Sequence, residues 1–313
     1  MDPYADALQA ALSALGDPPL FSSKLRVNSG TINAWVSDGD RRGFLKVGFG
    51  QGFHTESLRV RELYLLGLGP PVLASGTLTD FDAHYYLTLE IVDHEPLDQL
   101  LLDGSLSTAD LDAAISGLCR VPLTYDGFVA HEIAYVERLS QRWAELLTAT
   151  RGQVSDVTFR TANEAFENVA AALSAVSWAH LGRGPVPGDA HFGNIWVNRS
   201  TRSALFVDPA SFDELPISYD LGKLLQSVHL GYDRIMSGGE PVDSSANRHS
   251  WQYRWICSEI VNRWGVGALS DALVAESVHA VCLLPHHLHE PERFALLAQG
   301  ALDVGKQLLA DRS

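Results

Sequence analysis

Short stretches in which apolar residues alternate with polar ones, or follow one another directly, mark residues 1–92 of the chain. Such stretches are typical of β-strands. Between the last two of them, leucines recur at helical spacing over residues 55–66 and stop at the Gly67–Pro71 breaker. The pattern therefore predicts a small sheet with one helix, the strands covering residues 24–28, 32–37, 43–47 and 84–92.

Beyond residue 92 the apolar spacing changes to three and four, the period of an amphipathic helix. A polar turn at residues 198–202, flanked by apolar strand-like runs, predicts one hairpin, and a helix is expected to follow it with Ser218 as N-cap. The fold class is therefore α+β, with an N-terminal lobe at 1–92 and a mostly helical C-terminal lobe at 93–313. The other helices are expected at residues 97–102, 108–118, 133–147, 162–178, 251–264, 270–284 and 292–309.

Composition narrows the class of protein. Hydrophobic residues make up 46% of the chain, enough for a sizeable core, and no apolar run approaches the roughly 20 residues of a membrane span. The acidic start Met1–Asp6 lacks the cationic residues that begin a signal peptide. Cys119, Cys257 and Cys282 are odd in number and far apart, matching neither a disulfide framework nor a zinc site. We therefore expect a cytoplasmic protein without a membrane partner.

The charge balance bears on the partner. The formal net charge is −15, and nucleic acids are bound through clusters of Lys and Arg, so a nucleic-acid partner is not expected. An acidic cleft would instead raise the local concentration of a cationic small molecule such as an amino sugar. Acidic chains are also common simply because charge keeps proteins soluble, so this feature alone does not choose between the two explanations.

The hairpin brings three oxygen-bearing side chains together. Asp189 and Asn194 precede its first strand, and Asp208 follows the second. Because those two ends of an antiparallel pair lie side by side, we expect the side chains to converge. Phosphoryl transfer from a nucleotide needs oxygen ligands for magnesium and a carboxylate that receives the proton of the attacking hydroxyl. Taken singly, each of these residues is also ordinary turn chemistry.

The same residues resemble the motifs of the aminoglycoside phosphotransferase family, small-molecule kinases of the protein-kinase-like fold. That family carries a His-Gly-Asp-x-x-x-x-Asn loop and then an Ile-Asp motif, whereas protein kinases carry His-Arg-Asp and Asp-Phe-Gly motifs, both absent here. Pro187 stands in place of the family's His. The resemblance implies a two-lobe kinase-like fold, ATP and Mg²⁺ as cofactors, Asp189 as catalytic acid/base, and Asn194 and Asp208 as metal ligands.

Lys46 is the charged residue of an apolar strand, between Leu45 and Val47. A lysine there usually lies on the solvent face of a half-buried strand. The resemblance instead assigns it to the α- and β-phosphates of the nucleotide, held in place by a glutamate of the following helix. Glu56 and Glu62 are both candidates, and the distance from the helix end favours Glu56.

The resemblance also implies main-chain contacts to the nucleotide. Residues Ser29, Gly30 and Thr31 would lie over the phosphates and offer N–H groups, although a plain hairpin turn explains a loop with one glycine equally well. Main-chain groups of the connection between the lobes would contact the adenine, at Leu89, Glu90 and Ile91.

Five further side chains are candidates for supporting roles. Asp220 lies in the first turn of the helix after the hairpin, where an acid complements the helix dipole. The resemblance gives it a second role, which is to bond the backbone of the catalytic loop and hold its shape. Candidates for contact with the acceptor substrate are Asp213, Glu214, Tyr232 and Asp233.

These features predict an ATP-dependent kinase that transfers the γ-phosphoryl group to a hydroxyl of a small molecule. An aminoglycoside or aminocyclitol-type antibiotic is the leading acceptor. Residues 207–209 and 219–233 are also similar to kinase-fold proteins of sugar and polysaccharide pathways, so a sugar or sugar-containing metabolite is the second acceptor class. The third interpretation is a kinase-fold protein that binds a nucleotide without catalysis. The choice between ATP and GTP and the oligomeric state stay open.

Overall fold

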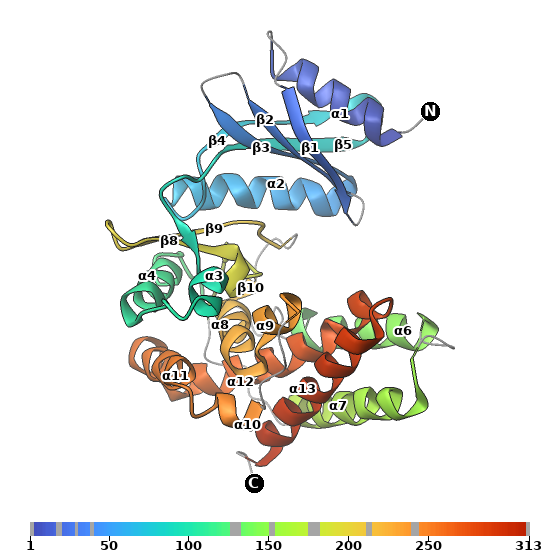
Figure 1. Cartoon of the computed structure of the whole chain (residues 1–313), viewed down its shortest axis with the longest axis vertical. Coiled ribbons are helices and arrows are strands. Elements are labelled where there is room, and N and C mark those ends of the chain that lie inside the picture. The colour runs from blue at the N-terminus through green and yellow to red at the C-terminus, as the bar shows by residue number, and fades with distance from the viewer. Residues whose placement is uncertain are drawn as a thin grey trace.

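The chain folds into two lobes, an upper N-lobe and a lower C-lobe (Figure 1). The computed structural model describes residues 3–16, 21–28, 31–37, 41–125, 133–149, 154–174, 182–210, 215–238 and 244–310. The two-lobe α+β fold predicted from the sequence is confirmed, with an antiparallel sheet in the N-lobe and a mostly helical C-lobe.

The N-lobe is a five-stranded antiparallel sheet in the order β1-β2-β3-β5-β4. Alternation along β2 buries Ile32, Ala34 and Val36 on one face, under helix α1 (Pro3–Ala14). Helix α2 (Gly50–Leu65) covers the opposite face (Figure 1). The strands are β1 (Phe21–Asn28), β2 (Thr31–Ser37), β3 (Arg42–Phe49), β4 (Val72–Leu78) and β5 (Ala83–Leu89).

Several N-lobe elements differ from the sequence prediction. Helix α1 and strand β4 were not expected. Helix α2 begins at Gly50 rather than at residue 55, because Gly50 adopts a φ of +74° and turns the chain from β3 directly into the helix. Strand β5 ends at Leu89 rather than at residue 92, because its partner β3 begins at Arg42. The chain beyond Leu89 leaves the sheet and connects the lobes.

The C-lobe surrounds the predicted hairpin, whose strands are β8 (Ile195–Asn198) and β9 (Ser203–Phe206). Strand β6 (Glu95–Pro96) pairs with β8, and β7 (Arg183–Gly184) pairs with β10 (Leu215–Pro216). The helices are α3 (Leu97–Leu102), α4 (Thr108–Leu118), α6 (Arg138–Ala149), α7 (Asp156–Ser174), α8 (Ile217–Leu225), α9 (Tyr232–Met236), α10 (Ser244–Asn247), α11 (Trp251–Trp264), α12 (Val266–Cys282) and α13 (Pro291–Ala310). Helices α3, α4 and α11 have the predicted bounds, whereas α7 and α12 begin earlier because their polar or small first turns carry no apolar period.

One helical stretch in the described part of the chain, Val266–His287, is long and apolar enough to cross a membrane by length and composition. Its most apolar window is 67% buried inside the protein, where α12 packs against α8 and α13. A core helix of a globular lobe has the same properties.

The end of helix α2 belongs to the C-lobe core. Leu63 and Leu68 are fully buried in the same apolar cluster as the C-lobe helices. The Arg120 guanidinium donates to the Leu66 carbonyl at 2.5 Å, and the Phe206 N–H of β9 donates to the Leu68 carbonyl at 2.7 Å. Within the described residues, the main chain therefore joins the N-lobe to the C-lobe at this corner and through the segment after β5.

Candidate active site

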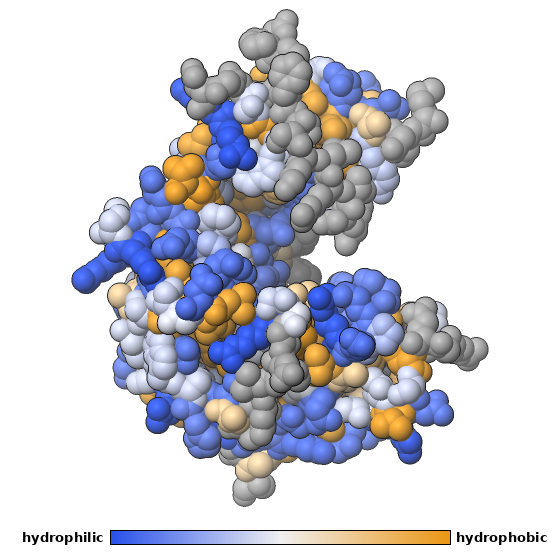
Figure 2. Space-filling view, viewed as in Figure 1, coloured by the Kyte–Doolittle hydropathy of each residue, from blue (hydrophilic) through white to orange (hydrophobic). Residues whose placement is uncertain are grey.

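A cavity of about 470 Å³ lies between the lobes. Figure 2 shows the surface indented at the level where the lobes meet. Side chains of both lobes line the cavity, including Phe44, Lys46, Asn194, Trp196, Phe206 and Asp208. Lys46 and the predicted metal ligands Asn194 and Asp208 therefore line one cavity.

Strand alternation places Lys46 on the face of β3 opposite to Leu45, toward α2. Its Nζ lies 2.8 Å from Glu56 Oε1 and 2.5 Å from Asp208 Oδ1, and Lys46 is only 7% exposed. Burial alone would lower the pKa of Lys46, but Asp208 and Glu56 outweigh it and raise the pKa, which keeps the ammonium charged. Lys46 is thus a buried cation shared by two carboxylates from different lobes.

Glu56 is the helix residue that pairs with Lys46. The Tyr86 hydroxyl of β5 also donates to Glu56 Oε1, at 3.0 Å. Burial raises the pKa of Glu56, and the nearby Lys46 ammonium opposes that rise. Glu62 lies farther along α2, half-exposed, and pairs with Arg59 at 3.2 Å. Of the two glutamates that the sequence left open, the structure brings only Glu56 to Lys46.

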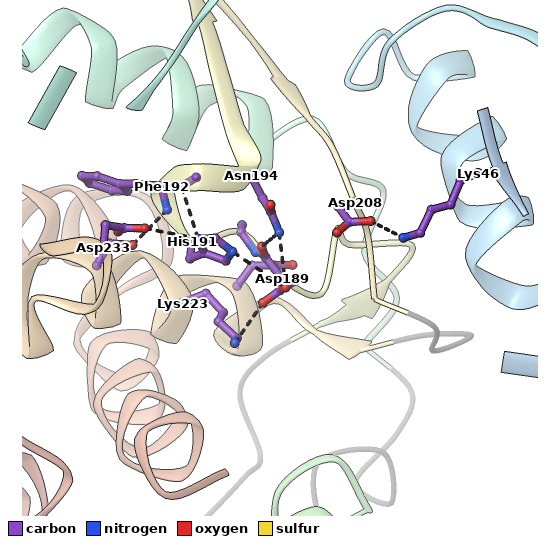
Figure 3. A network of polar contacts seen from close by, with 12 residues as sticks. Lys46, Asp189, His191, Phe192, Asn194, Asp208, Lys223 and Asp233 are labelled. Atoms are coloured by element: carbon purple, nitrogen blue, oxygen red, sulfur yellow. Dashed lines mark hydrogen bonds and ion pairs between the residues drawn. The ribbon is translucent and has the colours of Figure 1, made fainter. Parts of the chain in front are cut away.

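Asp189 lies in the loop before β8, where Gly188 takes a φ of +75° to make the turn. The Asn194 side-chain amide donates to the Asp189 carbonyl at 3.0 Å and to Asp189 Oδ2 at 3.2 Å (Figure 3). On the other side, Lys223 Nζ lies 2.9 Å from Asp189 Oδ1. Burial alone would raise the pKa of Asp189, but Lys223 and His191 outweigh it and hold the pKa well below its usual range. Asp189 is therefore an oriented, ionised carboxylate.

Asp208 follows β9 with a left-handed backbone, φ 50°, which aspartate tolerates. Its side chain is 57% exposed and projects to Lys46 (Figure 3). The Val207 N–H donates to the Asn194 carbonyl at 2.9 Å, which ties the two ends of the hairpin together. Asn194 and Asp208 thus line the same cavity, with Asp189 next to Asn194.

Asp220 holds the backbone of the Asp189 loop. It is fully buried in the first turn of α8 and accepts the Gly188 N–H at 2.8 Å and the Ala190 N–H at 2.9 Å. The predicted N-cap, Ser218, is wrong: Pro216 occupies that position, because Leu215 and Pro216 pair with β7 and lead the chain into α8 in extended conformation. The Ser218 hydroxyl instead lies 2.6 Å from the Tyr135 hydroxyl.

As Asp220 loses its proton with rising pH, we expect the stability of the fold to decrease and the activity to increase. Burial raises the pKa of Asp220 to about 7 in the folded chain, against an unfolded value near 3.9. Between about pH 4 and pH 7 the folded chain therefore binds more protons than the unfolded one, so stability falls as pH rises. Activity should rise over the upper part of this window, because only the carboxylate accepts both N–H groups.

Denaturant unfolding of the wild type and Asp220→Asn from pH 5 to pH 8 checks this prediction. The free energy of unfolding of the wild type, relative to the variant, should decrease toward pH 7 and then level off. Parallel curves for the two proteins would show that Asp220 does not titrate in this range.

His191 and Lys223 also lie beside Asp189, although no sequence motif pointed to either residue. His191 Nδ1 lies 3.4 Å from Asp233 Oδ1, and its Nε2 lies 4.0 Å from Asp189 Oδ2. Burial lowers the pKa of His191, but Asp233 and Asp189 outweigh it and raise the pKa above the ordinary value. A lysine one turn after Asp220, in an otherwise buried helix, is the signal that could have found Lys223.

Two of the acceptor candidates lie beside the Asp189 loop. Asp233 is buried and faces His191, and the Tyr232 ring packs edge-on against the same imidazole at 5.3 Å between centroids. Burial and the charge of Asp233 raise the pKa of Asp98, which lies close by at the start of α3. The candidates Asp213 and Glu214 lie outside the described residues.

The connection between the lobes lines the inner end of the cavity with Leu89, Glu90 and Ile91. The Leu89 N–H donates to the Pro71 carbonyl at 2.8 Å, and the Glu90 N–H donates to the Arg42 carbonyl at 2.9 Å. The N–H groups of Leu89 and Glu90 are thus hydrogen-bonded within the protein. Of the predicted phosphate loop, Ser29 and Gly30 lie outside the described residues, and Thr31 begins β2 opposite Gly48.

Comparisons with known proteins support the fold. No protein-family model and no curated protein sequence matches the chain. The solved structure of aminoglycoside phosphotransferase APH(4)-Ia matches with a TM-score of 0.61 at 13% identity, over 96% of this chain and 98% of that one. An aminoglycoside-3'-phosphotransferase of type VIII matches with a TM-score of 0.57 at 15% identity, over 89% and 100%. Spectinomycin phosphotransferase APH(9)-Ia, in complex with ADP and spectinomycin, matches with a TM-score of 0.51 at 9% identity, over 97% and 98%. The chain therefore has the fold of these proteins.

Proposed function

We propose that the chain is an ATP-dependent kinase that transfers the γ-phosphoryl group to a hydroxyl of a small, cationic acceptor. The observation that carries this proposal is the meeting, at one cavity between the lobes, of a buried lysine from the N-lobe with Asn194 and Asp208 of the C-lobe hairpin, with Asp189 hydrogen-bonded to Asn194. Each of these groups has a task in phosphoryl transfer.

The inner part of the cavity suits a nucleotide base. Phe44, Val60 and Phe206 provide apolar surface for a flat ring, and the Glu90 carbonyl and Ile91 N–H would offer an acceptor and a donor to its edge. The Lys46 ammonium, held by Glu56, would orient the phosphates. Asp208 is the second carboxylate partner of this ammonium, so nucleotide binding would exchange Asp208 for a phosphate.

The donor set on the C-lobe side fits magnesium. Asn194 uses its amide nitrogen on Asp189, which leaves its carbonyl oxygen as a ligand, and the Asp208 carboxylate is exposed to the same cavity. Carboxylate and amide oxygens are the hard ligands that Mg²⁺ prefers. Bound there, the ion would supply positive charge to the phosphates.

Asp189 would receive the proton of the acceptor hydroxyl while the acceptor oxygen forms its bond to the γ-phosphorus and ADP leaves. The low pKa of Asp189 makes it a weak base. Phosphoryl transfer passes through a loose transition state in which the hydroxyl loses its proton late, so orientation matters more than basicity.

Acidic groups beside Asp189 favour a cationic acceptor. The negative charge of Asp233 affects Asp98 more than the opposing charge of His191 does, so an ammonium group placed near Asp98 would relieve this repulsion. The whole chain carries a net charge of −15, which would attract the same kind of ligand. Matching structures hold hygromycin B or spectinomycin together with a nucleotide, so we extend an aminoglycoside or aminocyclitol acceptor to this chain.

A screen for acceptor-dependent ADP release tests the proposal, with the phosphorylated product identified by mass spectrometry. Polyamino aminoglycosides and aminocyclitols are compared with neutral sugars that present the same hydroxyl patterns. Turnover with the amino compounds is expected. Turnover with neutral sugars alone would favour the sugar-kinase interpretation, and magnesium-dependent ATP binding without phosphorylation of any acceptor would favour a binding protein. Absence of nucleotide binding would contradict the proposal altogether.

A further inference from the structure

Lys223 is a buried lysine on α8, only 7% exposed, and it is not among the residues that line the cavity between the lobes. All nine residues of α8 are buried, so an ammonium group on this helix is shielded from solvent. Burying a charge costs several kcal/mol unless it is paired. Its partner is Asp189 Oδ1 at 2.9 Å, the carboxylate that the proposed function makes the base.

Helix α8 contacts the Asp189 loop through two side chains that lie one turn apart. Asp220 accepts the N–H groups of Gly188 and Ala190, the residues on either side of Asp189. Lys223, three residues later, lies on the same face of the helix and contacts the side chain of Asp189 itself. One helix therefore sets both the backbone and the carboxylate of this residue.

The contacts of Asp189 distinguish its two oxygens (Figure 3). Oδ1 faces Lys223, whose side chain is 9% exposed, whereas the Asp189 side chain is 35% exposed. Oδ2 receives the Asn194 amide at 3.2 Å, and His191 Nε2 lies 4.0 Å from it. Lys223 thus engages Oδ1 in an ion pair from the buried side, whereas Oδ2 accepts one neutral amide N–H and retains a lone pair that can accept a substrate hydroxyl.

We propose that Lys223 is a positioning residue for phosphoryl transfer, which rests on the proposed function. Its ion pair with Oδ1 fixes the rotation of the Asp189 carboxylate so that Oδ2 meets the acceptor hydroxyl. Lys223 acts through Asp189 and does not contact the nucleotide. Asp220 and Lys223 therefore act together: Asp220 fixes the backbone of the loop, and Lys223 orients the Asp189 side chain.

The first test is Lys223→Met, which keeps the length of the side chain and removes its charge. We expect kcat to fall about 100-fold, the effect of misplacing a reacting group by about 1 Å, while KM for ATP changes less than about twofold. The double variant Lys223→Met/Asp189→Ala should be no slower than Asp189→Ala alone, because the lysine acts only through the aspartate. The matched control is Lys306→Met, since Lys306 forms an exposed ion pair with Glu164 and should not affect kcat.

A second measurement does not depend on turnover or on the folding of the Lys223 variant. The chain has four lysines, Lys24, Lys46, Lys223 and Lys306, so ε-¹³C-lysine labelling gives one resolvable NMR signal for each. Asp189→Asn should shift the Lys223 signal and leave that of Lys306 unchanged. An unchanged Lys223 signal would overturn the inference, because the ion pair would then not exist in solution.

The outcomes separate this inference from the proposed function. An active wild type with an equally active Lys223→Met variant would overturn the role of Lys223 alone. An additive double variant would do the same, since the lysine would then act elsewhere. A wild type that releases no ADP with any acceptor would overturn both, even if the NMR signal showed that the ion pair forms.

Discussion

Asp189→Ala is expected to slow phosphoryl transfer by about 1,000-fold while leaving magnesium-dependent ATP binding within about twofold of the wild type. The reason is the position of Asp189 in the site. Its carboxylate contacts Asn194 and Lys223 and lies 4.0 Å from His191 Nε2. It is not among the side chains that line the nucleotide cavity. Removing it should therefore take away the proton acceptor without disturbing the nucleotide.

Two measurements are needed, ADP release with the best acceptor of the screen and titration with a fluorescent ATP analogue. Asp103→Ala is a suitable control, because Asp103 is an exposed aspartate after α3 in the same lobe. A variant that retains a tenth or more of the wild-type rate would show that Asp189 is not the base. A variant that loses nucleotide binding as well would indicate damage to the hairpin instead.

Asp208→Ala is expected to give the opposite pattern, with ATP binding in the presence of Mg²⁺ weakened by about 100-fold. Loss of a carboxylate ligand to a metal–phosphate complex costs a few kcal/mol, and each 1.4 kcal/mol is tenfold in affinity. Without Mg²⁺, the same variant should bind ATP at least as well as the wild type. Asp208 now competes with the phosphates for Lys46, at 2.5 Å, and that competition would end.

Calorimetric titration with ATP, in Mg²⁺ and in EDTA, separates the metal-ligand role of Asp208 from its competition with the phosphates for Lys46. The contrast between the two aspartates is the decisive comparison, since Asp189→Ala should respond to Mg²⁺ like the wild type. Equal weakening of binding by Asp208→Ala in both conditions would contradict a metal-ligand role and would leave the Lys46 ion pair as the whole function of Asp208.

The parts of the site that were predictable are those encoded by local order. The hairpin strands have the expected positions, and Asp189 and Asn194 meet because only four residues of one loop separate them. Alternation along β3 is enough to place Lys46 opposite to Leu45. Counting back from the Gly67–Pro71 breaker placed the paired glutamate of the family resemblance at Glu56, and α2 ends where that breaker indicates.

What the sequence concealed depends on tertiary contacts. Lys223 contacts Asp189 although the two residues are 34 positions apart in the sequence, and no local pattern encodes that pairing. Serine is a good N-cap, so Ser218 was a reasonable choice, but pairing of β10 with β7 decided where α8 begins. Helix α1 was missed because alanines carry much of its buried face, Ala7 and Ala11 among them, and alanine gives a weak apolar signal.

The corner at the end of α2 has a consequence for motion of the lobes. Leu63 and Leu68 are embedded in the C-lobe, and the Phe206 N–H and Arg120 guanidinium hold the adjacent carbonyls. Together with the segment after β5, this gives two pivots, and a body held at two pivots can swing only about the line that joins them. The N-lobe should therefore rotate about this line, with small displacements near Leu63 and larger ones at the far ends of the strands.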